Sequence, residues 1–245
     1  MSMRKPHLLV FLALFASTSA AAQPGARAVI ERAHAAAGGE LWRRPETLTL
    51  KGSALLCQAG RCQAAESYAM WRVFPRESRN AHVANGQVRI DASSGGRVLF
   101  QTSFDGVDTY NQAGLVPGAQ ASREWSENFG FGIIRFALDP GFTLKTQAQE
   151  SVDGYLCDVV EVSDPGGTQT TFAIDRADAS IRRVGFQTTR GWHVRIYSDF
   201  LKLASGFMQP QRVRLYYDGV LSNDIWWQEI TVNQPIDPKR FQITP

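Results

Sequence analysis

The sequence is poor in the residues and motifs from which most enzymes and metal sites are built. Its 245 residues include four histidines and three cysteines, with no His-Glu-x-x-His motif, no Cys-x-x-Cys pair and no histidine cluster. A Gly-x-Ser-x-Gly nucleophile elbow and a Walker-type loop are also missing. Gly130-Phe131-Gly132 begins like a dinucleotide-binding fingerprint, but Arg135 stands where its third glycine belongs. We therefore expect no enzymatic activity, no cofactor and no metal.

The sequence also lacks a large excess of either positively or negatively charged residues. Twenty-six Lys and Arg face 23 Asp and Glu, a formal charge of +3, which is too small for a nucleic-acid-binding surface. The chain is 44% hydrophobic and 20% charged, a composition that builds a core and excludes general disorder. Its 21 Gly and 11 Pro are spread along the chain, which favours many turns and few long helices.

The sequence has no hydrophobic run long enough to span a membrane, and its longest apolar run lies at the N-terminus. Residues 1–22 contain Arg4 and Lys5, then an apolar run of about nine residues, far short of the roughly 20 of a membrane span. Ala20-Ala21-Ala22 supplies the small residues that signal peptidase requires. We interpret residues 1–22 as a cleavable signal peptide, and residues 23–245 as one exported, periplasmic domain.

Export changes the interpretation of the cysteines. Cys57 and Cys62 flank residues 58–61, a short glycine-containing segment that resembles a hairpin loop. In an oxidising compartment a disulfide is favoured. Zinc is the competing ligand, but no second Cys or His pair follows at ligand spacing. Cys157 lies in a strand-like run and is expected to be a buried small hydrophobe.

Two segments have the period of a helix. In residues 24–38 apolar side chains recur on one face before a pair of glycines. In residues 122–138, Ser122 suits a helix cap. Four apolar residues follow it at helical spacing: Trp125, Phe129, Ile133 and Phe136.

From about residue 47 onward the remaining chain has period two. Apolar and polar residues alternate most clearly in residues 68–74, 170–175, 192–197 and 212–217. Such alternation is typical of antiparallel strands with one apolar and one more polar face. No repeat or long linker divides the chain. The sequence predicts one mostly antiparallel β domain with a few helices.

Aromatic residues are abundant at 11%, and two interpretations of them stay open. The aromatic and apolar side chains either fill the core of a sandwich or barrel, or line a cavity that a bent sheet forms and a helix covers. Periodicity alone does not separate these alternatives.

Several short motifs resemble those of periplasmic lipoprotein carriers. Residues 70–79 resemble a family strand that ends in an Arg-Pro motif, and residues 104–110 resemble its Asp-Gly hairpin. Residues 171–183 resemble a later hairpin, and residues 236–245 resemble the closing segment. In this order and spacing, the chain resembles a divergent member of the LolA, LolB and LppX-like superfamily over nearly its whole mature length.

The resemblance implies an open, curved antiparallel half-barrel with helices over its concave face. In that family the cavity accepts acyl chains or a partner segment. The family's functional arginine directly precedes the proline, whereas here Phe74 precedes Pro75 and the nearest arginines are Arg72 and Arg76.

The candidate ligand-binding residues follow from this resemblance and from the apolar pattern. Phe129, Ile133 and Phe136 are expected to form the lid. The residues expected to line the cavity are Met70, Arg72, Phe172, Trp192, Ile196, Leu215 and Trp226.

The leading functional hypothesis is a periplasmic carrier or binding protein for a lipid or acylated lipoprotein. We expect it to be a monomer that meets a membrane-associated donor or acceptor protein, with no nucleic-acid partner. The alternative is a periplasmic sensor or protein-interaction module that uses the same half-barrel without lipid transport. A hydrolase is a third option, and it would require an activity that a single substitution abolishes.

Overall fold

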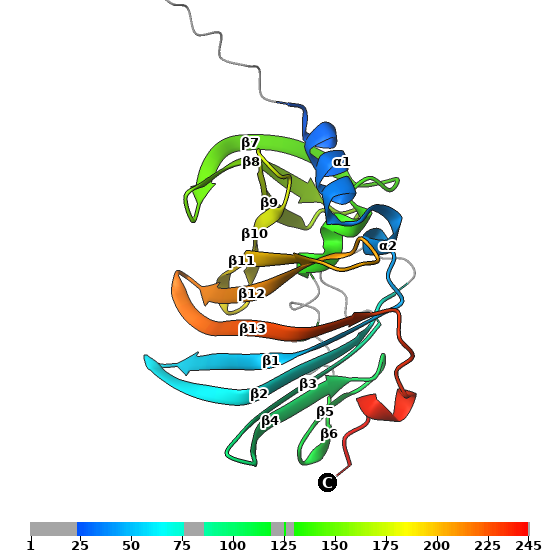
Figure 1. Cartoon of the computed structure of the whole chain (residues 1–245), viewed down its shortest axis with the longest axis vertical. Coiled ribbons are helices and arrows are strands. Elements are labelled where there is room, and N and C mark those ends of the chain that lie inside the picture. Colours follow the sequence, from blue (N-terminus) through cyan, green and yellow to red (C-terminus); the bar gives the residue numbers. More distant parts are fainter. Residues whose placement is uncertain (1–23, 76–85, 119–124, 126–129, 245) are drawn as a thin grey trace, which may run out of the picture.

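A single antiparallel sheet makes up most of the molecule (Figure 1). The structure is a computed structural model that describes residues 24–75, 86–118, 125 and 130–244. Within these ranges 13 strands pair in the order β6-β5-β4-β3-β2-β1-β13-β12-β11-β10-β9-β8-β7. The two ends of this order do not pair, so the sheet is open. The predicted open, antiparallel half-barrel is confirmed.

The chain runs through the sheet in hairpins. The first half contains β1 (Thr47–Gln58), β2 (Arg61–Val73), β3 (Gln87–Ser94), β4 (Arg97–Phe104), β5 (Thr109–Asn111) and β6 (Gly114–Val116). The second half contains β7 (Thr143–Val152), β8 (Tyr155–Ser163), β9 (Gln169–Asp175), β10 (Ile181–Thr188), β11 (Gly191–Lys202), β12 (Met208–Tyr217) and β13 (Val220–Val232). The β1–β13 pairing joins the two halves. Because this pairing bridges distant parts of the sequence, the half-barrel forms one unit.

Three helical segments pack together beside β7 to β12 (Figure 1). They are α1 (Ala26–Ala37), α2 (Gly39–Arg43) and the 3-10 helix η1 (Gly130–Phe136), and we call them the cap. The face of the sheet that they cover is the inner face. A fourth helical segment, η2 (Pro238–Phe241), packs on β3.

The core lies between the cap and the inner face. Val29 and Ile30 of α1 are fully buried there, and Ile133 and Ile134 of η1 are each 2% exposed. The sheet contributes alternate residues of its strands, among them Leu50, Tyr68, Phe172, Val184, Phe186, Val213 and Trp227. The helix expected in residues 24–38 is therefore confirmed as the amphipathic α1.

The second expected helix differs from its prediction. Trp125 is α-helical, but the described residues 130–136 form a 3-10 helix rather than an α-helix. Successive β-branched residues, Ile133 and Ile134, restrict side-chain rotamers in this short segment, and both are buried. Phe129 lies outside the described residues.

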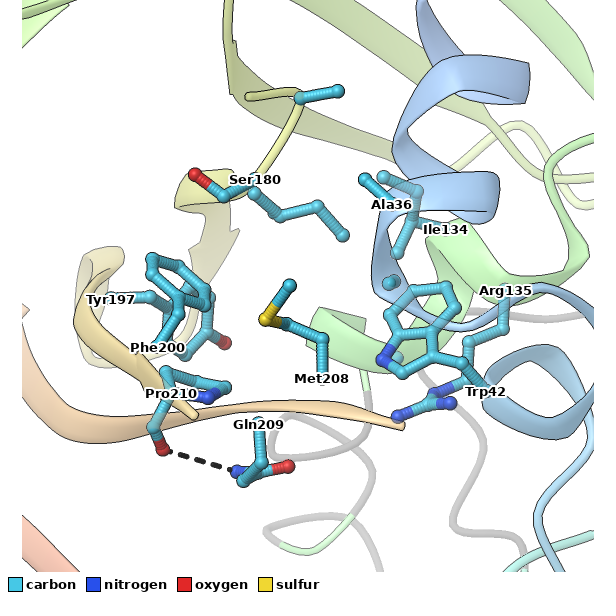
Figure 2. Close-up of a pocket in the computed structure, with 14 residues that line it drawn as sticks. Ala36, Trp42, Ile134, Arg135, Ser180, Tyr197, Phe200, Met208, Gln209 and Pro210 are labelled. Carbon is cyan, nitrogen blue, oxygen red and sulfur yellow. Dashed lines mark hydrogen bonds between the residues drawn. The ribbon is translucent and has the colours of Figure 1, made fainter. Parts of the chain in front are cut away.

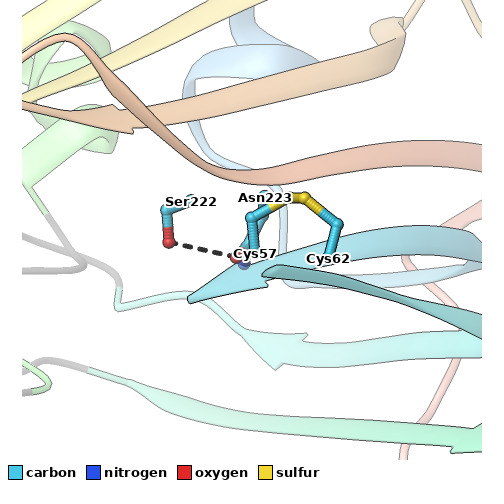
Figure 3. Close-up of a disulfide and its surroundings, with 4 residues drawn as sticks. All are labelled: Cys57, Cys62, Ser222 and Asn223. Carbon is cyan, nitrogen blue, oxygen red and sulfur yellow. Dashed lines mark hydrogen bonds between the residues drawn. A yellow bond between two sulfur atoms is a disulfide. The ribbon is translucent and has the colours of Figure 1, made fainter. Parts of the chain in front are cut away.

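The predicted disulfide joins Cys57 and Cys62 at the tip of the β1–β2 hairpin (Figure 3). The two cysteines are directly opposite each other in the strand register, with Cα atoms 4.1 Å apart. The loop is shorter than its predicted extent, because Gln58 and Arg61 pair as well. Ala59 and Gly60 both have positive φ, as a tight two-residue turn requires. Cys157 is a free, buried thiol, as predicted.

Candidate functional site

A partly open cavity of about 110 Å³, which we call the internal cavity, lies between the cap and the inner face (Figure 2). The cap contributes Ala36, Trp42 and Arg135 to its wall, and the sheet contributes Tyr197, Phe200 and Met208. Most of the lining is apolar. Because the walls come from segments far apart in sequence, the cavity exists only when the cap rests on the sheet.

Polar contacts hold the parts of the cap together. The Nε2–H of His34 in α1 donates to the carbonyl oxygen of Ile134 in η1, at 2.7 Å. Arg43 of α2 donates from Nε to the Arg135 carbonyl at 3.2 Å and from Nη2 to Asp139 at 2.9 Å. Two of these bonds engage backbone carbonyl oxygens near the C-terminal end of η1, and the third engages the Asp139 carboxylate. The cap is therefore one connected body rather than three independent segments.

Arg135 is the one charged side chain among the described residues that line this cavity. Its guanidinium stacks on Trp42 (Figure 2), with Cζ 4.1 Å from the ring centroid. It also lies 5.1 Å from the centroid of the Phe74 ring. Its Nη1 is buried and has no hydrogen-bond partner among the residues that the structure describes. Burial, and then the nearby positive charge of Arg72, lower the pKa of Arg135 to about 9. Arg135 is thus a partly buried cation that is held against aromatic rings.

Further positive charge lies on the inner face below the cap. Burial and the charge of Arg195 lower the pKa of Arg72 to about 9, and the Arg72 guanidinium lies 4.7 Å from the Phe74 ring. Burial raises the pKa of Tyr197, and the nearby charges of Arg195, Arg135 and Arg72 each oppose that rise. Arg72, Arg135 and Arg195 therefore concentrate positive charge around the phenol of Tyr197.

The structure places four of the predicted strand residues on the inner face. Arg72 is buried there, and Phe172 is fully buried in the core. Met70 and Leu215 are partly buried and pack against the same core. Ile133 and Phe136 lie in the cap and are also core residues, at 2% and 7% exposure. None of these six residues lines the internal cavity.

Three predicted cavity residues face the other way. Ile196 packs against an outer cluster that includes Cys157 and Val159. Trp192 lies over Gly185 and is 38% exposed, and Trp226 is 36% exposed beneath the Arg212 guanidinium. These three side chains are therefore not in the wall of this cavity. The outer face of this part of the sheet is apolar as well. Their alternation with neighbours was correct, but the inward-facing members of β11 and β13 are Tyr197 and Trp227.

The sequence reasoning missed the residues that do line the cavity. Ile134 and Tyr197 directly follow the predicted residues Ile133 and Ile196 in the sequence. The opposite choice of inward-facing residue at these two places would have identified them. Trp42 and Met208 had no comparable signal, because each reaches the cavity from the end of a short or irregular segment. Arg135 was noticed only for interrupting a glycine pattern.

A second, open hollow of about 660 Å³ lies at the disulfide end of the half-barrel. Leu56, Leu99 and Phe100 contribute its apolar part, and Arg61 and Arg190 lie at it. Figure 3 shows Ser222 and Asn223 of β13 beside the disulfide. Within the described ranges, no three His, Cys, Asp or Glu side chains gather as they would around a metal ion.

Comparison with known proteins connects this geometry to one fold. A DUF1329 family protein from Desulfovibrio piger superposes with a TM-score of 0.53 at 12% identity, over 90% of this chain and 98% of its own. A LolA superfamily protein from Nitrosomonas europaea superposes with a TM-score of 0.50 at 11% identity, over 90% and 98%. The fold is LolA-like.

A third similar structure is a domain named for outer membrane lipoprotein sorting, from Vibrio parahaemolyticus. Its TM-score is 0.51 at 11% identity, over 89% of this chain and 95% of that one. No protein-family model and no curated protein matches the sequence. At these identities the LolA-like likeness concerns the fold. Among the described helices, none is both long and apolar enough to span a bilayer.

Proposed function

We propose that this protein is a non-enzymatic periplasmic carrier or binding protein that holds an acyl chain of a lipid or lipoprotein inside its half-barrel. The observation that carries the proposal is the apolar cavity between the cap and the inner face. The LolA-like fold and the similar domain named for lipoprotein sorting support it. Each buried methylene contributes about 0.8 kcal/mol, so an acyl chain supplies a large driving force for entry.

The volume of the cavity limits how much of an acyl chain can enter while the cap stays in place. Ligand sites for drug-sized molecules usually occupy about 300–1,000 Å³, whereas this cavity holds about 110 Å³. It admits the end of a chain or a small head group in the arrangement described. A whole acyl chain requires the cap to move off β11 and β12. The hydrogen bonds of His34 and Arg43 keep the cap intact during such a movement.

Filling the cavity tests this function. Ala36 lines the cavity, whereas Ala35, beside it on α1, is exposed. We expect Ala36→Leu to weaken binding of oleate about tenfold or more, because the larger side chain occupies space that the ligand needs. Ala35→Leu is the matched control and should bind as the wild type does. Native mass spectrometry of each protein with added oleate measures the bound fraction.

Two results would contradict the carrier proposal. One is a wild-type protein that binds no acyl ligand, and the other is equal binding by both leucine variants. A stable complex with another periplasmic protein in the absence of lipid would then favour the sensor or interaction module.

Export is part of the proposal. We propose cleavage after Ala22, which leaves Gln23 as the first residue of a monomeric mature protein, because Ala20 and Ala22 occupy the positions that signal peptidase reads. Intact-mass measurement of protein recovered from the periplasm checks the cleavage. A mass that retains residues 1–22, or one that carries an acyl adduct, would contradict it.

A further inference from the structure

We infer that the ligand of the internal cavity is an amphiphile with an anionic head group, a carboxylate or a phosphate, and that Arg135 binds this head group. The inference rests on the proposed function, since it names the chemical class of the molecule whose acyl chain the half-barrel holds. Nothing in an acyl chain itself requires a cation in the cavity wall.

The geometry of Arg135 points to an anion. Its side chain lies in the wall of an otherwise largely apolar cavity, and its buried Nη1 has no hydrogen-bond partner within the described ranges. A buried donor without a partner costs free energy, and a buried guanidinium costs more unless an anion accompanies it. The aromatic faces of Trp42 and Phe74 offset only part of this cost. An anionic oxygen at Nη1 would satisfy both the charge and the donor.

The surrounding charges favour the same ligand. No acidic side chain is among the described residues that line the cavity. Asp139, which follows η1, is bonded to Arg43 and Arg44 on the outside of the cap. Arg72 lies near enough to Arg135 to lower its pKa. The field inside the cap is therefore positive, and it attracts an anion while it repels a cationic head group.

The position of Arg135 also orients the chain. Figure 2 shows Arg135 next to Trp42 at one side of the cavity and Ser180, Tyr197 and Phe200 at the other. A head group at Arg135 would leave the chain to run over Met208 and the rings opposite. The cavity volume of about 110 Å³ suits a head group or a chain end, and the rest of the chain would follow when the cap moves.

The test compares three ligands that share one acyl chain: oleate, 1-oleoyl lysophosphatidate and 1-monooleoylglycerol. Binding is measured below their micelle concentrations by the fluorescence of Trp42 and the other tryptophans, at pH 7.5. We expect the wild type to bind at least one anionic ligand about tenfold or more tightly than the neutral glyceride, since hydrogen bonds to charged groups have this magnitude. The tighter of the two anions identifies the head group as carboxylate or phosphate.

Substitution of Arg135 locates the effect. Arg135→Met removes the charge and keeps the length of the side chain, and we expect it to abolish the preference for the anion while leaving affinity for the glyceride within about twofold. Arg135→Lys keeps the charge and should retain most of the preference. Arg27→Met is the control, because Arg27 is an exposed arginine on α1 paired with Glu31. Thermal unfolding of each variant shows whether it folds.

The outcomes separate this inference from the proposed function. Equal wild-type affinity for the anionic and neutral ligands would overturn the inference and leave the acyl-binding function standing. An equal loss of affinity for all three ligands in a folded Arg135→Met protein would also overturn it. Failure of all three ligands to bind the wild type would overturn both. The wild-type comparison decides the matter even where a variant does not fold.

Discussion

Arg195 donates a hydrogen bond from Nε to Nε2 of His193, 2.9 Å away, on the inner face of the half-barrel. Because Nε2 accepts this bond, the imidazole is neutral and its proton lies on Nδ1. The ring is 1% exposed and lies between Phe186 and Tyr217, with centroid distances of 5.0 and 4.6 Å. Burial, and then the charges of Arg195 and Arg190, lower the pKa of His193 to about 2.

This arrangement predicts that the protein loses stability in mild acid. The unfolded chain protonates its histidines near the ordinary pKa of 6.5, whereas folded His193 stays neutral, so the unfolded state binds more protons below pH 6.5. The contribution of His193 is complete above that pH and is lost as the pH falls. Between pH 7 and 5 we expect a loss of about 2 kcal/mol from this residue. Urea unfolding at pH 7, 6 and 5 measures it.

A non-titrating variant supplies the control. His193→Gln keeps an acceptor for Arg195 and should flatten the pH dependence, whatever its effect on stability at pH 7. Burial also lowers the pKa of His34. The stability of the His193→Gln variant should therefore keep a smaller pH dependence of the same sign. A wild-type protein that becomes more stable between pH 7 and 5 would contradict the neutral, buried assignment.

Phe136→Ala should act mainly on stability. The side chain is 7% exposed in the core between cap and sheet, and it does not line the internal cavity. Truncation of a buried phenylalanine costs about 3–5 kcal/mol, so we expect a loss near the lower end of that range in the free energy of unfolding. Leu115→Ala, at a side chain that is 57% exposed, should change it by less than about 0.5 kcal/mol. Equal denaturant midpoints for the two variants would show that the cap does not pack as described.

Removal of the disulfide should lower stability modestly. It closes a loop of only a few residues, for which chain entropy corresponds to about 2 kcal/mol. We expect this loss in the double variant Cys57→Ser/Cys62→Ser, and no further effect when dithiothreitol is added to it. Non-reducing peptide mapping of the wild type should recover the Cys57–Cys62 pair. A bridge that contains Cys157 would contradict the structure.

Gly52→Ala tests the close approach of β1 and β13. The register of this pair shifts between Lys51 and Gly52, and a Cβ added at Gly52 would lie 1.8 Å from the carbonyl oxygen of Trp226. Since that neighbour is backbone, one of the strands must move, and we expect a loss of about 2 kcal/mol or more. Ser53→Ala, one residue further along, keeps its Cβ and should cost less than about 0.5 kcal/mol. Chemical unfolding of both variants compares them.

Local pattern was enough to predict many of the elements of this fold, although not the 3-10 helix η1. The two-residue alternation of strands such as β11 and β12, the amphipathic period of α1 and the hairpin between Cys57 and Cys62 depend on near neighbours in the chain. The LolA-like architecture followed from the order of several weak motifs. None of these inferences required knowledge of which distant segments meet.

The sequence by itself determined which residues of a strand share a face, and only the tertiary structure decided which face is the inner one. Trp192 and Ile196 are as apolar as inward-facing residues, but an outer cluster around Cys157 receives Ile196, so alternation had no way to distinguish the two sides. The cavity is likewise tertiary, because residues as far apart in the sequence as Ala36 and Pro210 meet in its wall. The same holds for Arg135, because only the tertiary structure places this cation in the cavity wall with Nη1 buried.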